Sequence, residues 1–214
     1  MRTWITSGNG ALTVTTLIAA GTGLALLGAL VTQGISARTI TACLLVLCFV
    51  VFTFGGVLFS GRAFLNWQIG DMSAHLLWER GFVIGGIVFT ALGLALLEDL
   101  LRAAGETVLS RLGILAYLIG AAVALVAETA YLDKRDWHYP QIVLYVVLAF
   151  LGQALLGASL LHSGLVSRWV GWVTILWNAI WLPVLLIFSP RNMYFPVLHH
   201  VAPLMIGIAL LAGR

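Results

Sequence analysis

Residues Gln141–His162 read QIVLYVVLAFLGQALLGASLLH, a run without a single Asp, Glu, Lys or Arg. A helix rises about 1.5 Å per residue, so about 20 apolar residues are enough to cross the roughly 30 Å hydrocarbon core of a bilayer. Lipid offers no hydrogen bonds, and an α-helix pairs its backbone groups within the segment. The run therefore predicts a transmembrane helix.

Stretches of the same character lie on both sides of this run, and together they predict an all-α, polytopic transmembrane helical bundle of about seven spans in a single domain, residues 1–214. The shortness of the third stretch, and Pro196 and Pro203 in the last one, make six spans the alternative. The first stretch is too long for the apolar region of a signal peptide, so we interpret it as a retained span. The predicted spans are Ala11–Thr32, Thr39–Phe59, Gly81–Leu97, Arg111–Leu132, Gln141–His162, Trp169–Phe188 and Phe195–Ala212.

The composition of the whole chain agrees with this class. Of 214 residues, 61% are hydrophobic and 9% are charged, and the mean hydropathy is +1.06. Soluble domains carry about 25% charged residues, so this chain cannot cover an aqueous surface, and its partner is the lipid bilayer. The net charge is +3. Its ten arginines are scattered singly, whereas a nucleic-acid-binding protein gathers its cations on one face, so no nucleic acid partner is expected.

The two ends of the bundle are distinguished as follows. Side A is the face with the connection between the second and third spans, residues 60–80, where the N-terminus is also expected, and side B is the opposite face. Six cations fall on side A and five on side B. The positive-inside rule needs a clear imbalance, so the orientation in the membrane stays open.

Ionisable and amide groups at membrane depth are functional hypotheses, because burying them in lipid is costly. Glu128 lies about one turn before the end of the fourth span, where it could bind a ligand, reach the interface or pair with an Arg or His. Asn178 lies near the middle of the sixth span. It could line a polar pocket or hydrogen-bond across the bundle, with Gln153 as a candidate partner.

Four of the five histidines are expected at side A. His199 and His200 lie about a turn inside the seventh span, while His75 and His138 lie in side-A connections. His199 and His200 therefore join Glu128 and Asn178 as candidate ligand-binding residues. A haem held by two histidines is geometrically awkward, because His162 lies on side B.

A possible divalent metal site rests on a regular spacing of acidic and imidazole groups. Asp71, His75 and Glu79 are four residues apart, so on a helix they would share one face. Together with His199 and His200 they could ligate a metal ion. The same pattern is typical of the solvated face of an interfacial helix, which is the alternative interpretation.

The connection between the fifth and sixth spans is similar to a known family. Residues 157–172 read GASLLHSGLVSRWVGW, and the pattern S-G-L-[LV]-x-R-W-[LV]-G-W resembles an uncharacterised bacterial family of multi-pass membrane proteins, a domain of unknown function. Ser167 replaces the proline that is usual there. The resemblance implies a bacterial cytoplasmic (inner) membrane protein and brings no known activity.

Three functions stay open at this level. The first is binding or transport of a small or lipid-like molecule. The second is a membrane-embedded, metal-dependent hydrolase with a His and carboxylate site at one membrane face, including Asp71, His75, Glu128, His199 and His200. The third is an accessory or structural subunit that packs against a membrane-protein partner or forms a homo-oligomer.

Overall fold

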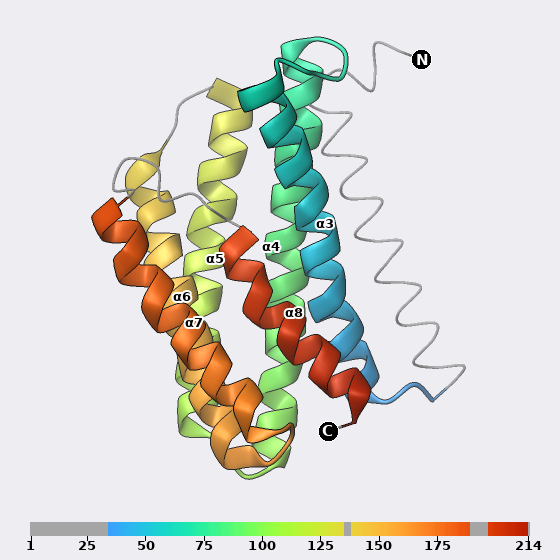
Figure 1. Ribbon diagram of the computed structural model, residues 1–214, viewed down its shortest axis with the longest axis vertical. Helices are drawn as coiled ribbons and strands as arrows, with labels where there is room; N and C mark the ends of the chain where they lie inside the picture. The colour runs from blue at the N-terminus through green and yellow to red at the C-terminus, as the bar shows by residue number, and fades with distance from the viewer. Residues whose placement is uncertain (1–33, 135–137, 189–196, 214) are drawn as a thin grey trace.

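The computed structural model describes residues 34–134, 138–188 and 197–213, and within them every regular element is a helix (Figure 1). The predicted span Ala11–Thr32 lies outside the described residues. The helices are α3 (Ala37–Leu65), α4 (Met72–Ala103), α5 (Val108–Lys134), α6 (Tyr139–Ser163), α7 (Arg168–Phe188) and α8 (Val197–Ala212).

Five of these helices, α3 to α7, are long and apolar enough to cross a membrane, whereas α8 has only 16 residues. The predicted number of seven spans is therefore not confirmed. Large apolar side chains stand on the outside of the bundle: Phe54, Ile119 and Ile180 are each more than half exposed. A soluble protein rarely leaves so much apolar surface uncovered, which indicates that lipid surrounds these helices.

The connection between α3 and α4 is much shorter than the sequence indicated. The predicted loop 60–80 contains a true connection of only residues 66–71, and the predicted third span, Gly81–Leu97, is the middle of the longer α4. The carboxylate of Asp71 caps α4 by accepting a hydrogen bond from the N–H of Ala74 at 2.7 Å. Hydropathy predicted only the apolar part of these helices. Their polar turns were assigned to a loop, although in the structure these turns contact one another instead of water.

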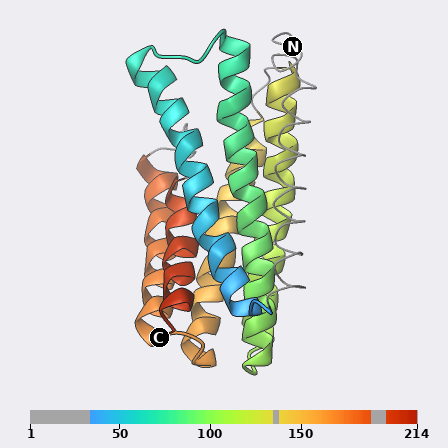
Figure 2. The ribbon, with the colours of Figure 1, turned by 90° about the vertical axis from the view of Figure 1, so that its right-hand side faces the viewer.

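The helices follow one another around a closed ring, in which α3 packs on α4, α4 on α5, α5 on α6 and α6 on α7 (Figures 1 and 2). The last helix, α8, completes the ring by packing mainly on α3 and also on α7, with further contacts to α4 and α6. Figure 1 shows that α8 begins about halfway along the bundle and ends at side B. Its first residues therefore lie in the interior.

Glycines set the closest helix contacts. A methyl group on Gly113 of α5 would lie 2.7 Å from the carbonyl oxygen of Gly152, and one on Gly152 of α6 would lie 2.6 Å from that of Gly113. Gly157 and Gly171 meet between α6 and α7 in the same way. Close backbone approach holds helices together in lipid, where no hydrophobic effect drives them to associate.

The side-B turn between α4 and α5 is organised by Glu106. Its carboxylate accepts hydrogen bonds from the N–H groups of Val108, Leu109 and Ser110 at the start of α5. The hydroxyl of Ser159 in α6 donates a further bond of 2.7 Å to the same carboxylate. Partial burial alone would raise the pKa of Glu106, but the bonds from Ser159, Ser110 and Leu109 outweigh it and lower the pKa from 4.5 to about 2.

This arrangement predicts a pH-dependent contribution of Glu106 to stability. Because the pKa is lower in the folded state, the contribution is complete above pH 4.5 and is lost as the pH falls towards 2. Glu106→Gln should cost about 1–2 kcal/mol of unfolding free energy at pH 7, the usual size of a helix cap. Unfolding in detergent, measured at several pH values, should show the difference from wild type narrowing below pH 4.5. A difference that stays constant down to pH 2.5 would contradict this assignment.

Candidate functional site

Four charged residues form a buried ion-pair network near side A. Glu79 of α4 accepts hydrogen bonds from Arg62 of α3 through both carboxylate oxygens, with N···O distances of 2.8 and 3.0 Å. The guanidinium of the neighbouring Arg80 lies 3.0 Å from the same carboxylate. Arg80 in turn reaches Glu128 of α5 at 3.3 Å. The ion-pair network, Arg62, Glu79, Arg80 and Glu128, thus joins α3, α4 and α5.

The network balances its charges away from water. The side chains of Glu79, Arg80 and Glu128 are at most 5% exposed, and Arg62 is 24% exposed. Two cations and two carboxylates sum to zero, which is how charges are tolerated at membrane depth. Arg80 also lies over the ring of Tyr131, 5.0 Å from its centre. Pairing of Glu128 with an arginine was one of the alternatives that the sequence left open, and the structure shows that this arginine is Arg80.

His75 has a structural position in the same region. Its Nδ1 accepts a hydrogen bond from the N–H of Ile69 at 2.9 Å, so its Nε2 carries the proton and donates to the carbonyl of Leu58 at 3.0 Å. The fully buried ring therefore fixes the connection 66–71 against the end of α3. This corrects the interpretation of His75 and Glu79 as a solvated face: both are helical, as the spacing suggested, but both are buried.

The five residues proposed to ligate a metal do not converge on one point, although Nε2 of His75 lies 3.7 Å from Oε2 of Glu79. Asp71 caps α4, His75 bonds to backbone groups, and Glu79 lies between two arginines. Among the described residues, no group of three or more His, Cys, Asp and Glu is arranged to hold a metal ion. The geometry therefore gives no support to the metal site or to the hydrolase built on it.

A second group of polar side chains lies in the middle of the bundle. We call it the polar layer, and it consists of Thr90, Tyr117, Tyr145, Gln153, His199 and His200. All six are at most 1% exposed, and they come from α4, α5, α6 and α8. Their groups are hydroxyls, an amide and imidazoles, so the layer contains no carboxylate and no guanidinium. It is chemically distinct from the ion-pair network.

The two histidines of the layer point towards different neighbouring helices. His200 hydrogen-bonds through Nδ1 to the hydroxyl of Thr90 at 2.9 Å and stacks on Phe52 of α3. His199 lies against Tyr145 and Phe150 of α6, with ring centres 5.3 and 4.2 Å apart. The contact side chains come from different helices, which explains why α8 is held so deeply in the bundle.

Gln153 and the two tyrosines complete the layer. The amide of Gln153 donates to the backbone carbonyl of His199 at 2.8 Å, so its partner is α8 and not Asn178. The rings of Tyr117 and Tyr145 meet edge to face, with centres 6.4 Å apart. Their hydroxyls lie close to one another, and the hydroxyl of Tyr117 also lies close to Thr90.

The polar layer contains more hydrogen-bonding groups than it satisfies internally. Within the part of the chain that the structure describes, no partner bonds to either ring nitrogen of His199 or to Nε2 of His200. The same holds for the side-chain oxygen of Gln153. A polar group buried without a partner costs several kcal/mol in an apolar medium. A layer with so many of these groups is suited to hold a molecule that bonds to them.

The polar layer and the ion-pair network lie at different depths. Thr90 follows Arg80 by ten residues on α4, a distance of about 15 Å along the helix axis. The depth of Thr90 gives no support to the expectation that Glu128, His199 and His200 share one side-A mouth, which stays a prediction. Thr90, which hydrogen-bonds to His200, follows His75 by fifteen residues on α4, about 22 Å along the helix axis, so His75 and His200 are too far apart to bind one ion.

Asn178 of α7 is buried, but its bonding is local. Its amide nitrogen donates to the carbonyl of Thr174, one turn earlier, at 2.7 Å. Its side-chain oxygen has no partner among the described residues. No contact with the polar layer supports a shared site, so its place in a ligand site stays a prediction.

Sequence reasoning did not single out Tyr117, Tyr145 or Thr90. Tyrosine and threonine are common in membrane helices, and only the helix arrangement brings these three to the histidines. Arg62 and Arg80 were also missed as interior residues, because both were assigned to a loop. The sequence indicated that Glu128 could pair with an Arg or a His, but it did not identify Arg80 as the partner.

No protein-family model matches the chain, and no curated protein or solved structure matches it either. The similarity of residues 157–172 to an uncharacterised family stays a prediction. In the structure Gly164 ends α6 with a φ of 64°, a conformation that favours glycine. The two tryptophans of this sequence pattern, Trp169 and Trp172, lie at the start of α7 and are more than half exposed, as interfacial anchors should be.

Proposed function

We propose that this membrane protein binds a small uncharged molecule in its polar layer, as a step in transport or sensing. The observation that carries the proposal is His199, whose ring is fully buried while neither nitrogen has a partner among the described residues. A neutral imidazole offers one donor and one acceptor. A bound molecule with hydroxyl, amide or carbonyl groups would satisfy both.

The chemistry of the layer favours an uncharged ligand. A carboxylate or an ammonium group would enter the membrane interior without an ion of opposite charge in the layer, which is costly. The tyrosine hydroxyls and His200 add donors and acceptors, while Phe52 and Phe150 offer apolar faces beside them. Small polyols, ureas and ring compounds with oxygen substituents fit this description. The loop resemblance supports a bacterial cytoplasmic membrane as the location.

Solute flux tests the proposal through His199→Leu. Protein reconstituted in liposomes should speed the entry of glycerol or urea, followed by light scattering after rapid mixing. The variant should reduce this rate to that of protein-free liposomes, because leucine offers no hydrogen bond. Its thermal stability should be unchanged or higher, since an unpartnered polar group has been replaced by an apolar one of similar size.

The matched control is His162→Leu, at the exposed end of α6 on side B. It should leave the flux at the wild-type rate. If wild-type protein does not accelerate either solute, transport of this class is excluded. If His199→Leu and His162→Leu conduct equally well, the polar layer is not the site.

A further inference from the structure

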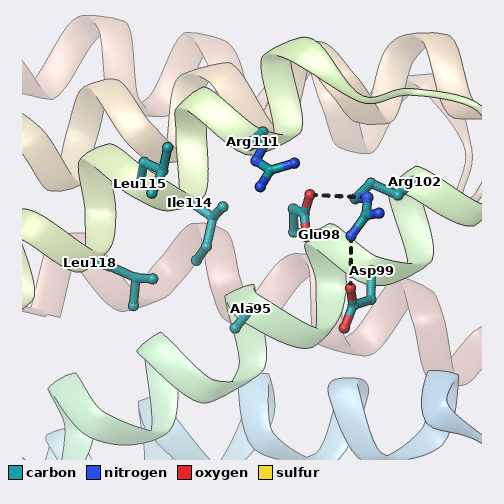
Figure 3. Close-up of a pocket in the computed structure, with 8 residues that line it drawn as sticks. All are labelled: Ala95, Glu98, Asp99, Arg102, Arg111, Ile114, Leu115 and Leu118. Atoms are coloured by element: carbon teal, nitrogen blue, oxygen red, sulfur yellow. Dashed lines mark ion pairs between the residues drawn. The ribbon is translucent and has the colours of Figure 1, made fainter.

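A cleft between α4 and α5 at side B is independent of the polar layer. It has a volume of about 290 Å³. Figure 3 shows charged side chains at one end of the cleft and apolar ones at the other. Its lining residues are Ala95, Glu98, Asp99, Arg102, Arg111, Ile114, Leu115 and Leu118.

The charged end contains both signs in weakly coupled form. Arg102 lies 3.7 Å from Glu98 and 3.6 Å from Asp99, distances longer than those of good charge-assisted hydrogen bonds. Arg111, on the α5 side, forms no ion pair with any described residue. The cleft therefore offers the unpaired guanidinium of Arg111 and the carboxylates of Glu98 and Asp99, which Arg102 engages only weakly. The two arginines and the two carboxylates together carry no net charge.

The apolar end continues towards the membrane interior. Ile114, Leu115 and Leu118 follow Arg111 by three to seven residues, which places them about 5–10 Å deeper along α5. Leu115 and Leu118 are 49% and 38% exposed, so this wall opens onto the surrounding lipid. Arg102 and Arg111 lie within one turn of their helix ends, at the level of the headgroups.

We propose that this cleft binds one phospholipid whose headgroup carries both a phosphate and a primary ammonium group. The phosphate accepts hydrogen bonds from Arg111, and the ammonium donates to the carboxylates of Glu98 and Asp99. The upper part of an acyl chain lies along Ile114, Leu115 and Leu118. The balanced charges of the cleft match this headgroup better than a purely anionic one, which would meet two carboxylates.

Native mass spectrometry of the purified chain, titrated with defined phospholipids, tests the proposal. Phosphatidylethanolamine should bind about tenfold more tightly than phosphatidylcholine, whose quaternary ammonium donates no hydrogen bond. Phosphatidylglycerol should also bind more weakly than phosphatidylethanolamine. Arg111→Gln should weaken phosphatidylethanolamine binding about tenfold, because the charge-assisted bond to phosphate is lost.

Two further variants make the test specific. Arg168→Gln removes another exposed side-B arginine, outside the cleft, and should bind lipid as wild type does. The double variant Glu98→Gln with Asp99→Asn leaves the cleft positive and should prefer phosphatidylglycerol to phosphatidylethanolamine. Equal binding of phosphatidylethanolamine and phosphatidylcholine by wild type would overturn the proposal. So would tighter binding of phosphatidylglycerol, or equal effects of Arg111→Gln and Arg168→Gln.

Discussion

Glu79→Gln should destabilise the protein by about 3–5 kcal/mol, the usual cost of breaking a buried ion pair from one side. The carboxylate is 1% exposed and bonds to Arg62 through both oxygens, while Arg80 lies 3.0 Å away. Glutamine keeps the shape and removes the negative charge, so both guanidiniums lose their shared counter-ion, although Glu128 still balances Arg80. Equilibrium unfolding in mixed micelles with increasing dodecyl sulfate measures the change.

Glu98→Gln is the matched control, because it makes the same substitution on the same helix. Among the described residues Glu98 forms an ion pair with Arg102 alone, at 3.7 Å and at the partly exposed end of α4. Such pairs contribute about 0–1 kcal/mol. If Glu79→Gln is no more destabilising than Glu98→Gln, the ion-pair network is not what joins α3, α4 and α5 at side A.

Gly152→Leu should produce a loss of similar size through a different cause. Even a methyl group at this position would lie 2.6 Å from the carbonyl oxygen of Gly113 and 3.0 Å from the backbone nitrogen of Tyr117. These atoms belong to the α5 backbone, so they cannot move unless the two helices separate. Overpacking costs about 1–3 kcal/mol for a small addition, and the whole leucine side chain should exceed that range.

Gly85→Ala is the comparison for this prediction. Of the residues that the structure describes, a methyl group at Gly85 of α4 would meet just the end of the Val51 side chain, at 3.3 Å. Alanine also favours helix by about 1 kcal/mol over glycine, so this variant should be neutral or slightly stabilising. Gly152→Ala should already lower the unfolding midpoint. Equal midpoints for Gly152→Ala and Gly85→Ala would show that α5 and α6 do not depend on this contact.

The helices and their class were predictable because one physical constraint governs them. In lipid a backbone must satisfy its own hydrogen bonds, so apolar runs such as Gln141–His162 usually form α-helices. That run lies within α6, Tyr139–Ser163, as predicted. The ends were less predictable. α3 and α4 extend through polar turns that hydropathy assigned to a loop, because the groups of those turns bond to each other.

The candidate sites were predictable only in part. Glu128, His199 and His200 were recognisable as groups that must find partners at membrane depth. Their partners come from other helices: Arg80 for Glu128, Thr90 for His200, and the aromatic rings of α6 for His199. Spacing along the chain carries no information about such contacts between helices. The metal hypothesis failed to gain support for this reason.

The sequence by itself determined that this chain is helical and suited to lipid, since about 20 consecutive apolar residues have few other structures open to them. The tertiary structure alone decided which polar groups meet. Close glycine contacts set the helix ring, and the ring placed four charges together near side A and six neutral polar groups in the middle. Whether polar groups on two helices meet depends on how each helix is rotated about its axis and on how deep each group lies in the bundle. Helix packing fixes both, and composition fixes neither.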